Sequence, residues 1–402
     1  MANIEGLQKL AHDAFEFLKE FDWVHSTQVT HILDGTLHKI PCEWLPVLTN
    51  MSTDELNNFP FLGESSAYLY PLWPTSLHRF LDLAARLNIE RGQAELKPAT
   101  VDFRMARGMN PKKLHEVSYI ATLIHDIMAE TGCDTVVDVG SGLGYLDHVL
   151  HQVFGHTVVG LETSESHVSG AESRAANQGL QCEGIKTLRF NLVNDVVCFQ
   201  QFDELLSTIV SASTCQCKNA IKDDCTSFPL SSYCKKQCHR LMPWHILPQT
   251  LRLGAQETRS RWRMQSEEDH RNHIRHIAFR GLLELADCDD AAARRKLVRK
   301  CDFSSFKAFQ DSYYSSSTFS ASEISSGKST LSYLYNEHKE DFSLIEIFTA
   351  LQVVLQPVIE CLIHHDRLLW LLEQGYSHSK VKIIPVFDEA VSPRNLATVA
   401  IK

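Results

Sequence analysis

A strand, a glycine-rich turn and a helix follow one another in Thr135–Leu150, where the chain reads TVVDVGSGLGYLDHVL. A second apolar stretch, His156–Ser164, comes next and ends near an acid, Glu162. Glycines let a backbone approach a ligand without an intervening Cβ, and the first turn of a helix presents free N–H groups. An acid about 20 residues further on can accept hydrogen bonds from ribose hydroxyls. This segment therefore predicts an α/β sheet with a nucleotide-like cofactor at the turn.

The spacing of the glycines separates two classes of cofactor. Dinucleotide-binding turns have a third glycine or alanine where the strand and helix pack tightly, and this chain has Tyr145 at that position. Its G-x-G-x-G turn, which begins two residues after Asp138, resembles that of class I S-adenosylmethionine (SAM) methyltransferases. The resemblance implies that Asp138 and the turn hold the methionine end of SAM and that Glu162 holds its ribose. A ligand-free turn and an NAD or FAD site stay open as alternatives.

The elements around the turn are those of a strand–helix–strand unit. A helix predicted to begin after Asn110 and to end at Gly132 leads into the first strand. Ser166–Gly179 is the next predicted helix and Gly184–Phe190 the third strand. A polar residue after that strand often contacts adenine in the fold that the turn resembles, so Asn191 is a candidate beside its reading as a simple turn residue. The predicted cofactor site comprises Asp138, Gly140, Ser141, Gly142, Gly144, Tyr145, Glu162 and Asn191.

The rest of the chain alternates between helical and irregular stretches. Residues 204–212 suit a fourth strand, residues 312–329 predict a serine-rich mobile loop, and a helix over 347–374 precedes strands at 381–387 and 397–401. The predicted fold is a Rossmann-like α/β sheet of the class I SAM methyltransferase type, with a helical N-terminal region and a helical and irregular insertion. Its predicted parts are 1–105, the helical N-terminal region; 106–213, the first half of the methyltransferase domain with the SAM site; 214–342, the insertion; and 343–402, the C-terminal helix and closing strand pair.

Charge and composition exclude several classes of protein. The chain has 402 residues and a formal net charge of -10, which argues against a general polyanion binder. Its most apolar stretch, Leu344–Ile363, is interrupted by polar residues and predicts a core helix, not a membrane span. The N-terminus lacks the pattern of a secretory signal, and 12 cysteines are consistent with reduced thiols. We therefore expect an intracellular protein, cytoplasmic or nuclear, with no membrane partner.

Two clusters of potential metal ligands have simpler interpretations. The cysteines within 215–238 are irregularly spaced, which favours unpaired thiols in a loop over a zinc site. His270, His273 and His276 recur every third residue, and a solvated helix face is favoured because no acid partner is evident. The arginines of 250–280 are largely offset by acids, which favours salt-bridged helices over an RNA-binding face. No metal is expected.

Several blocks of the chain resemble the methyltransferase-like protein 25 family, some of whose members are also named ribosomal RNA adenine dimethylase domain-containing proteins. KKLHEV at Lys112–Val117 is followed by VVDVGSGLGYL, and FPLS begins at Phe228. The resemblance continues in the N-terminal LTNMSTDELNNFP and is strongest in Leu355–Tyr376 and Pro385–Lys402. These blocks together cover most of the chain. The resemblance implies a SAM-dependent methyltransferase fold.

The chain departs from that family between Asn191 and Phe228. Family members carry a block resembling T-G-L-H-x-C-G-D-L at the fourth strand and a G-C-C-Y block near the fifth, and neither is present here. The Asn-x-Pro-Tyr loop with which adenine dimethylases hold a flipped adenine is also missing. No residue stands out as a general base, so no catalytic residue is assigned.

Two functions remain in view. We expect a SAM-dependent methyltransferase that acts on an RNA or protein acceptor of unknown identity. The alternative is a catalytically degenerate methyltransferase fold that serves as an interaction module, which the missing fourth-strand block favours. A dinucleotide oxidoreductase is disfavoured by Tyr145. The sequence does not assign an oligomeric state.

Overall fold

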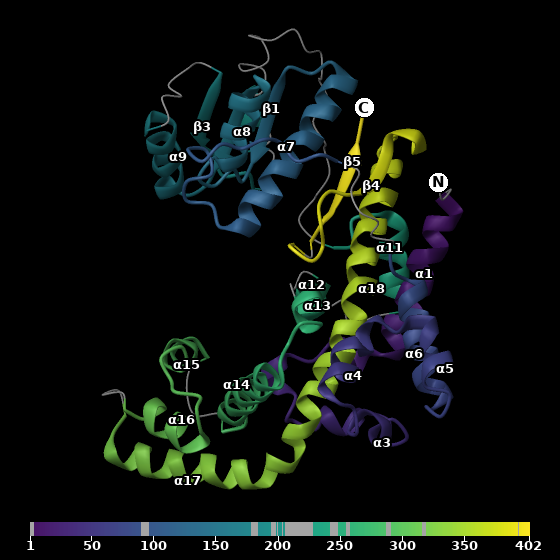
Figure 1. The fold of residues 1–402 in the computed structure, drawn as a ribbon, viewed down its shortest axis with the longest axis vertical. Helices are drawn as coiled ribbons and strands as arrows, with labels where there is room; N and C mark the ends of the chain where they lie inside the picture. Colours follow the sequence, from purple (N-terminus) through teal and green to yellow (C-terminus); the bar gives the residue numbers. More distant parts are fainter. Residues whose placement is uncertain are drawn as a thin grey trace. The chain divides into compact units, whose positions relative to one another are not determined.

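The computed structural model describes residues 4–89, 96–177, 184–193, 198, 200–202, 204–205, 228–241, 248–254, 258–286, 291–315, 319–392 and 394–402. The chain forms two compact units, each made of two stretches of sequence. The helical unit comprises Met1–Glu90 and Ser231–Leu369, and the sheet unit comprises Arg91–Leu230 and Trp370–Lys402. Figure 1 labels the elements of both.

The sheet unit contains the predicted strand–helix–strand segment (Figure 1). Its first three strands form a parallel sheet in the order β1-β2-β3, with Asp138 opposite Gly160 and Leu161 opposite Leu188. Helices join consecutive strands, as parallel pairing requires, so the predicted α/β class of this segment is confirmed. The elements of the unit are α7 (Pro111–Thr131), β1 (Thr135–Val139), α8 (Tyr145–Phe154), β2 (Thr157–Glu162), α9 (Glu165–Asn177), β3 (Ile185–Arg189), β4 (Val381–Pro385) and β5 (Leu396–Ala400).

Helix α7 begins and ends at the residues that its sequence predicts. The side chain of Asn110 accepts a hydrogen bond from the backbone N–H of Lys113, and Pro111 occupies the first helical position. At the other end Gly132 is left-handed, with φ of 72°, and its N–H donates to the carbonyl of Met128. The chain then passes directly into β1.

One hydrophobic cluster joins α7 and α8 to the sheet. Val117 and Ala121 of α7, Val149 and Leu150 of α8 and Val158 of β2 are all buried in it. Full burial of a valine or leucine side chain stabilises a fold by about 1.5–3 kcal/mol relative to an exposed one. This core therefore fixes the positions of β2 and α8, and with them the glycine turn that leads into α8.

The C-terminal strands β4 and β5 pair antiparallel, with Ile383 opposite Thr398. Just after β4, Val386 and Phe387 pack with Leu123 of α7, so the pair is held on that helix. The two predicted C-terminal strands are confirmed. Among the described residues they form a sheet separate from β1–β3, and the predicted fourth strand at 204–212 lies largely outside those residues.

The long helix α18 is the centre of the helical unit. It is buried along most of its length, and its residues up to Leu369 belong to that unit. By length and composition Ala321–Glu373 could cross a membrane, but 78% of its most apolar window is buried inside the structure, which identifies a core helix. The helices of the unit are α1 (Ile4–Glu20), α2 (Asp22–His25), α3 (Leu45–Leu48), α4 (Thr53–Asn58), α5 (Ser66–Leu69), α6 (Thr75–Arg86), α11 (Ser232–Leu241), α12 (Pro248–Gly254), α13 (Thr258–Trp262), α14 (Glu267–Leu285), α15 (Ala291–Val298), α16 (Phe306–Tyr313), α17 (Ala321–His338) and α18 (Leu344–Glu373).

The serine-rich segment 312–329 is helical in most of its described part, so the prediction of a mobile loop was wrong. The segment includes the end of α16 and the first half of α17. Ser320 and Glu323 form a capping box at the start of α17, each accepting a hydrogen bond from the other's backbone N–H. Gly327 of α17 packs closely against the ring of Tyr314. Composition alone misses a serine-rich helix because the cap and the packing depend on individual positions.

The histidines of α14 do not form a solvated face, because the first of them is buried. His270 contacts the carboxylate of Glu346 on α18 through Nδ1 and Asn57 Oδ1 through Nε2. His273 also reaches Glu346, and the ring of His276 stacks on an aromatic side chain. The acid partner is 76 residues away from His270 in sequence, which is why the local pattern missed it. No group of three or more acids, histidines or cysteines in the described part of the chain is placed to hold a metal.

The cysteine-rich segment is partly helical. Its residues 215–227 lie outside the described structure, but Cys234 and Cys238 are buried on α11, so the expectation of an irregular loop was wrong for that part. The expected salt-bridged helices are confirmed further on. Arg271 pairs with Glu267 and Glu268, at 2.7 and 3.0 Å.

Candidate functional site

The turn between β1 and α8, residues 140–144, is named here the glycine loop. Gly140, Gly142 and Gly144 all have positive φ, of 83°, 60° and 69°. Residues with a side chain rarely adopt this conformation, so the backbone favours glycine at all three positions. A Cβ added at Gly140 or Gly142 would meet no atom within 4 Å. The space beside these two glycines is therefore open, as the approach of a ligand requires.

The glycine loop is fastened to the neighbouring strand. The N–H groups of Gly140 and Ser141 both donate to the carbonyl of Leu161 in β2, at 2.7 and 3.2 Å. The N–H of Gly144 donates to the carbonyl of Ser141 at 3.0 Å, and α8 begins at Tyr145. The loop geometry is thus set by the protein itself, and the first turn of α8 starts at the carboxyl edge of the sheet.

Glu162 at the end of β2 binds the middle of the glycine loop. Its Oε2 accepts a hydrogen bond from the N–H of Gly142 at 2.9 Å, and its Oε1 accepts from the N–H of Ser164 at 2.8 Å and the hydroxyl of Thr163 at 3.2 Å. These bonds, chiefly the one from Ser164, hold the pKa of Glu162 below its ordinary value. The group is therefore a carboxylate at neutral pH. Oε2 has a further lone pair with which it can accept another hydrogen bond.

Asp138 lies near the end of β1, half-buried, and has an acidic neighbour. Asp147, in the first turn of α8, is 0% exposed. Burial, together with the charge of Asp138, raises the pKa of Asp147 to about 8. Asp147 is not among the site residues that the sequence pattern predicts. The available signal was an acid inside the otherwise apolar start of a helix, YLDHVL, directly after the glycine loop.

Tyr145 anchors the segment that precedes α7. Its hydroxyl donates to the carbonyl of Gly108 at 2.9 Å. The guanidinium of Arg174 lies 3.9 Å from the centre of its ring and donates to the carbonyl of Arg107 at 2.7 Å. The residue that blocks a dinucleotide turn thus ties the approach to α7 to the start of α8. Its contact with a cofactor stays a prediction.

Asn191 lies two residues after β3 and is exposed at the carboxyl edge of the sheet. Exposed aliphatic side chains accompany it at the strand ends. Val139 at the end of β1 is 55% exposed, and Leu192 and Val193 beside Asn191 are exposed as well. The strand ends therefore offer both polar and apolar contacts, and the role of Asn191 beside adenine stays a prediction.

A second polar cluster joins α7 to the segment between β4 and β5. The hydroxyl of Ser392 donates to the carboxylate of Glu116 at 2.7 Å, and Lys112 Nζ is 3.8 Å from the same oxygen. The ring of His115 stands edge-on to that of Phe387. Lys112, His115 and Glu116 lie in the first half of α7, which follows the Gly108 segment that Tyr145 anchors.

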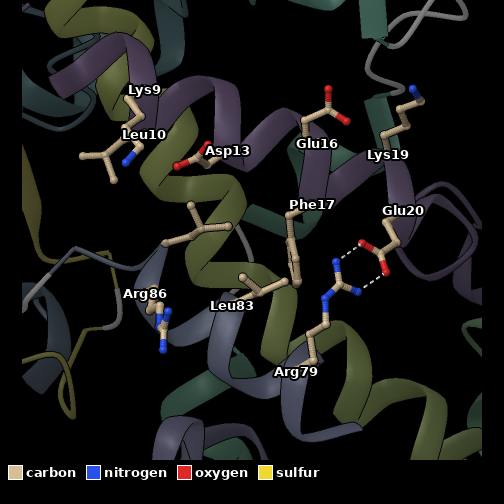
Figure 2. Close-up of a pocket in the computed structure, with 11 residues that line it drawn as sticks. Lys9, Leu10, Asp13, Glu16, Phe17, Lys19, Glu20, Arg79, Leu83 and Arg86 are labelled. Carbon is tan, nitrogen blue, oxygen red and sulfur yellow. Dashed lines mark hydrogen bonds and ion pairs between the residues drawn. The ribbon is translucent and has the colours of Figure 1, made fainter. Parts of the chain in front are cut away.

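A pocket of about 790 Å³ lies elsewhere, in the helical unit between α1 and α6 (Figure 2). Leu10, Phe17 and Leu83 form part of its wall, and Arg79 and Glu20 pair with each other there. None of the predicted cofactor residues lines it. The side chains that line the pocket carry charges of both signs, and Arg79 is already paired with Glu20. We therefore assign no chemistry to the pocket.

Comparisons with known proteins match the part of the sheet unit that contains the glycine loop. Residues 112–216 match the family model described as a methyltransferase domain. A Homo sapiens protein named "Probable methyltransferase-like protein 25" is 42% identical over 66 residues, which are 16% of this chain and 11% of that protein. The Mus musculus protein of the same name is 41% identical over 66 residues, with the same coverage. No solved structure matches the chain.

The chain matches only a short part of the length of these relatives. The methyltransferase match begins in α7 and includes the glycine loop, Glu162 and β3. It therefore contains the open glycine loop and the carboxylate that binds it. Residues 112–216 therefore form a methyltransferase domain, and a short stretch of the chain is similar to methyltransferase-like protein 25.

Proposed function

We propose that the sheet unit binds SAM at the glycine loop and transfers its methyl group to a nitrogen, oxygen or carbon nucleophile of an RNA or protein acceptor. One observation carries the proposal. Three left-handed glycines lie between β1 and α8, and the N–H of the middle one is bound by the carboxylate that ends β2. The proposal includes a class I Rossmann-like fold, of which β1–β3 and their helices are the described part.

The residues at the loop fit SAM in charge and in space. Asp138 is a carboxyl group at the strand end and suits the ammonium of a methionine end. Glu162 Oε2 can accept a ribose hydroxyl in addition to the Gly142 N–H. The exposed side chain of Val139 offers an apolar contact. SAM has no phosphate, so the tight turn of a dinucleotide site, which Tyr145 prevents, is not required.

The chain's own contribution would be orientation. Bound SAM supplies an electrophilic methyl group on a sulfonium centre. Transfer by in-line displacement depends on holding the methyl carbon and the nucleophile in one line, and positioning of this kind accounts for much of the rate in such reactions. Asp138 and Glu162 would fix the two ends of the cofactor, because the hydrogen bonds of the loop and the core under α8 hold both acids in place.

Transfer of a radiolabelled methyl group from SAM to the total RNA and total protein of a cell extract tests this function. The decisive variant is Gly142→Asp, which puts a side chain into the open space of the loop. Gly132→Asp is the matched control, because Gly132 is also left-handed with no atom near its Cβ position but lies at the end of α7 away from the loop. We expect label in one fraction with the wild type and Gly132→Asp, and none with Gly142→Asp. Equal labelling by all three proteins would contradict the proposal.

A second candidate function is cofactor binding without transfer, in an interaction module. The observation that favours it is the missing family block between Asn191 and Phe228. The same assay separates the two functions. SAM binding that Gly142→Asp abolishes, with no label in either fraction, would favour the interaction module.

A further inference from the structure

A notch over Gly160 of β2 holds the carboxyl group of Asp147. A Cβ at Gly160 would stand 2.5 Å from Asp147 Oδ2 and 2.7 Å from Ser141 Oγ, so these groups occupy the space that a side chain there would need. Asp138 is directly opposite Gly160 in the pairing of β1 with β2. Directly paired residues of neighbouring strands project from the same face of a sheet. The notch therefore brings Asp138 and Asp147 together from different elements.

The surroundings of Asp147 do not suit a negative charge. The residue is 0% exposed, and neither of its oxygens accepts a hydrogen bond from a donor within the described part of the chain. The carboxyl group of Asp138 nevertheless acts on it through its charge and through a side-chain hydrogen bond. Two carboxylates repel each other and cannot form a hydrogen bond, whereas a carboxylic acid can donate to a carboxylate. The contact is therefore favourable only when one of the two acids carries a proton.

We propose that Asp147 carries a proton at neutral pH and donates it in a hydrogen bond to Asp138, which makes Asp147 a positioning residue for the carboxylate that receives SAM. The proposal rests on the function proposed above. The negative charge remains on Asp138, because solvent reaches that residue and does not reach Asp147. The hydrogen bond fixes the orientation of Asp138 and leaves its lone pairs on the solvent side for the ammonium of the cofactor.

The electrostatic surroundings agree with this assignment. Burial and the neighbouring Asp138 raise the pKa of Asp147 to about 8. His148 on the same helix is buried near it, and Glu162 on β2 is a carboxylate already held by backbone N–H groups. His125 of α7 lies at the far end of α8, against the ring of its last residue. From α9, the neutral Ala171 packs against the first turn.

Thermal unfolding without SAM tests the proton directly. An ordinary aspartate has a pKa of about 4, so between about pH 4 and pH 8 the folded state would hold a proton that the unfolded state releases. Stability must then fall as pH rises through this range. Asp147→Asn keeps a hydrogen-bond donor but cannot ionise, so its Tm should rise relative to that of the wild type between about pH 6 and pH 9. Asp126→Asn, at an exposed acid of α7, is the matched control, and its Tm should change with pH as that of the wild type does.

Two results of that experiment would overturn the proposal. One is a pair of parallel curves for the wild type and Asp147→Asn. The other is a difference between them that disappears in His148→Gln, because the titrating group would then be the histidine.

Calorimetric titration of SAM tests the positioning role. At about pH 6.5 Asp147→Asn should bind within about threefold of the wild type, while Asp147→Leu, which cannot donate, should bind at least about tenfold more weakly. At about pH 9 the SAM affinity of the wild type should fall relative to that of Asp147→Asn. Because both proteins are measured at the same pH, the titration of the cofactor itself does not affect the ratio of the two affinities. Wild-type affinity in Asp147→Leu would overturn the role. No binding by any variant would instead overturn the proposed function, and the unfolding curves would still decide whether Asp147 carries the proton.

Discussion

The carboxylate of Glu162 accepts a hydrogen bond at 2.9 Å from the backbone N–H of Gly142, 20 residues earlier in the chain. The bond joins the end of β2 to the middle of the glycine loop. The acid proposed to hold the ribose and the loop proposed to hold the methionine end are therefore one connected structure. A change at either residue is expected to disturb the other.

Replacing Glu162 with glutamine should weaken SAM binding at least about tenfold. The amide has one oxygen, so it cannot accept from the N–H groups of both Gly142 and Ser164 through separate oxygens. Calorimetric titration measures the loss. Glu165→Gln is the matched control, because Glu165 is exposed and pairs with Arg189 at the surface, where ion pairs contribute little. Equal SAM affinity of the two variants would show that Glu162 does not contribute to the binding of the cofactor.

The pH dependence of the same variant has a defined sign. Because the folded-state pKa of Glu162 is lowered, the stability that its carboxylate contributes is present at neutral pH and is lost as pH falls through the folded pKa. The difference in Tm between the wild type and Glu162→Gln should therefore be constant near neutrality and shrink in acid, below about pH 4.

Removing the hydroxyl of Tyr145 should loosen the segment before α7. Tyr145→Phe keeps the ring under Arg174 but leaves the Gly108 carbonyl without its donor, at a cost of about 0.5–1.5 kcal/mol. Hydrogen exchange should accelerate in residues 105–109 while the core of α8 stays protected. Tyr68→Phe, at an exposed tyrosine of the helical unit, should change neither the stability nor the hydrogen exchange of residues 105–109. Unchanged exchange in Tyr145→Phe would show that the bond does not hold the segment.

Adding a methyl group at Gly160 should destabilise the sheet unit. Its Cβ would fall 2.5 Å from Asp147 Oδ2, so the carboxyl group must move out of the notch, at a cost of about 1–3 kcal/mol. Gly170→Ala is the matched control, because its Cβ would meet only the end of the flexible Leu143 side chain and alanine favours a helix. Urea unfolding of both variants checks this. We expect Gly160→Ala to be the less stable of the two. The reverse order would show that the Asp147 carboxyl group does not fill the space over Gly160.

In the helical unit, Glu346→Gln should lower the free energy of unfolding by about 3 kcal/mol. Both ring nitrogens of His270 face acceptors, because the amide nitrogen of Asn57 is used by the Gln265 carbonyl. The variant replaces the buried carboxylate that both His270 and His273 contact with a neutral amide. Burial would raise the pKa of Glu346, but hydrogen bonds from His270 and His273 outweigh it and hold that pKa below its ordinary value. Glu337→Gln, at an exposed acid of α17, is the control for the Tm measurement.

The local patterns of the sequence predicted the glycine loop and its neighbours because those elements depend on nearby residues. The Asn110 cap, the Gly132 end of α7 and the three loop glycines are each decided by the backbone conformation of a few positions. The same applies to the two C-terminal strands, which alternate in their burial and pair with each other.

The features that the sequence analysis missed depend on contacts between distant segments. The burial of His270 follows from Glu346, which lies on another helix. The serines near residue 320 form a helix cap whose strength depends on packing around α17. Asp147 is special only because Gly160 on β2 leaves a notch for it beside Asp138. Such relations appear only when the elements are placed in space.

Calorimetric titration of SAM into the 402-residue chain is the first test of whether the glycine loop binds the cofactor. Gly142→Asp and Gly132→Asp are compared with the wild type, because both glycines are left-handed but only the first lies in the loop. If the loop binds SAM, we expect a saturable isotherm for the wild type and Gly132→Asp, and no binding heat for Gly142→Asp. Folded wild-type protein that gives no isotherm, or a Gly142→Asp variant that binds as the wild type does, would contradict it.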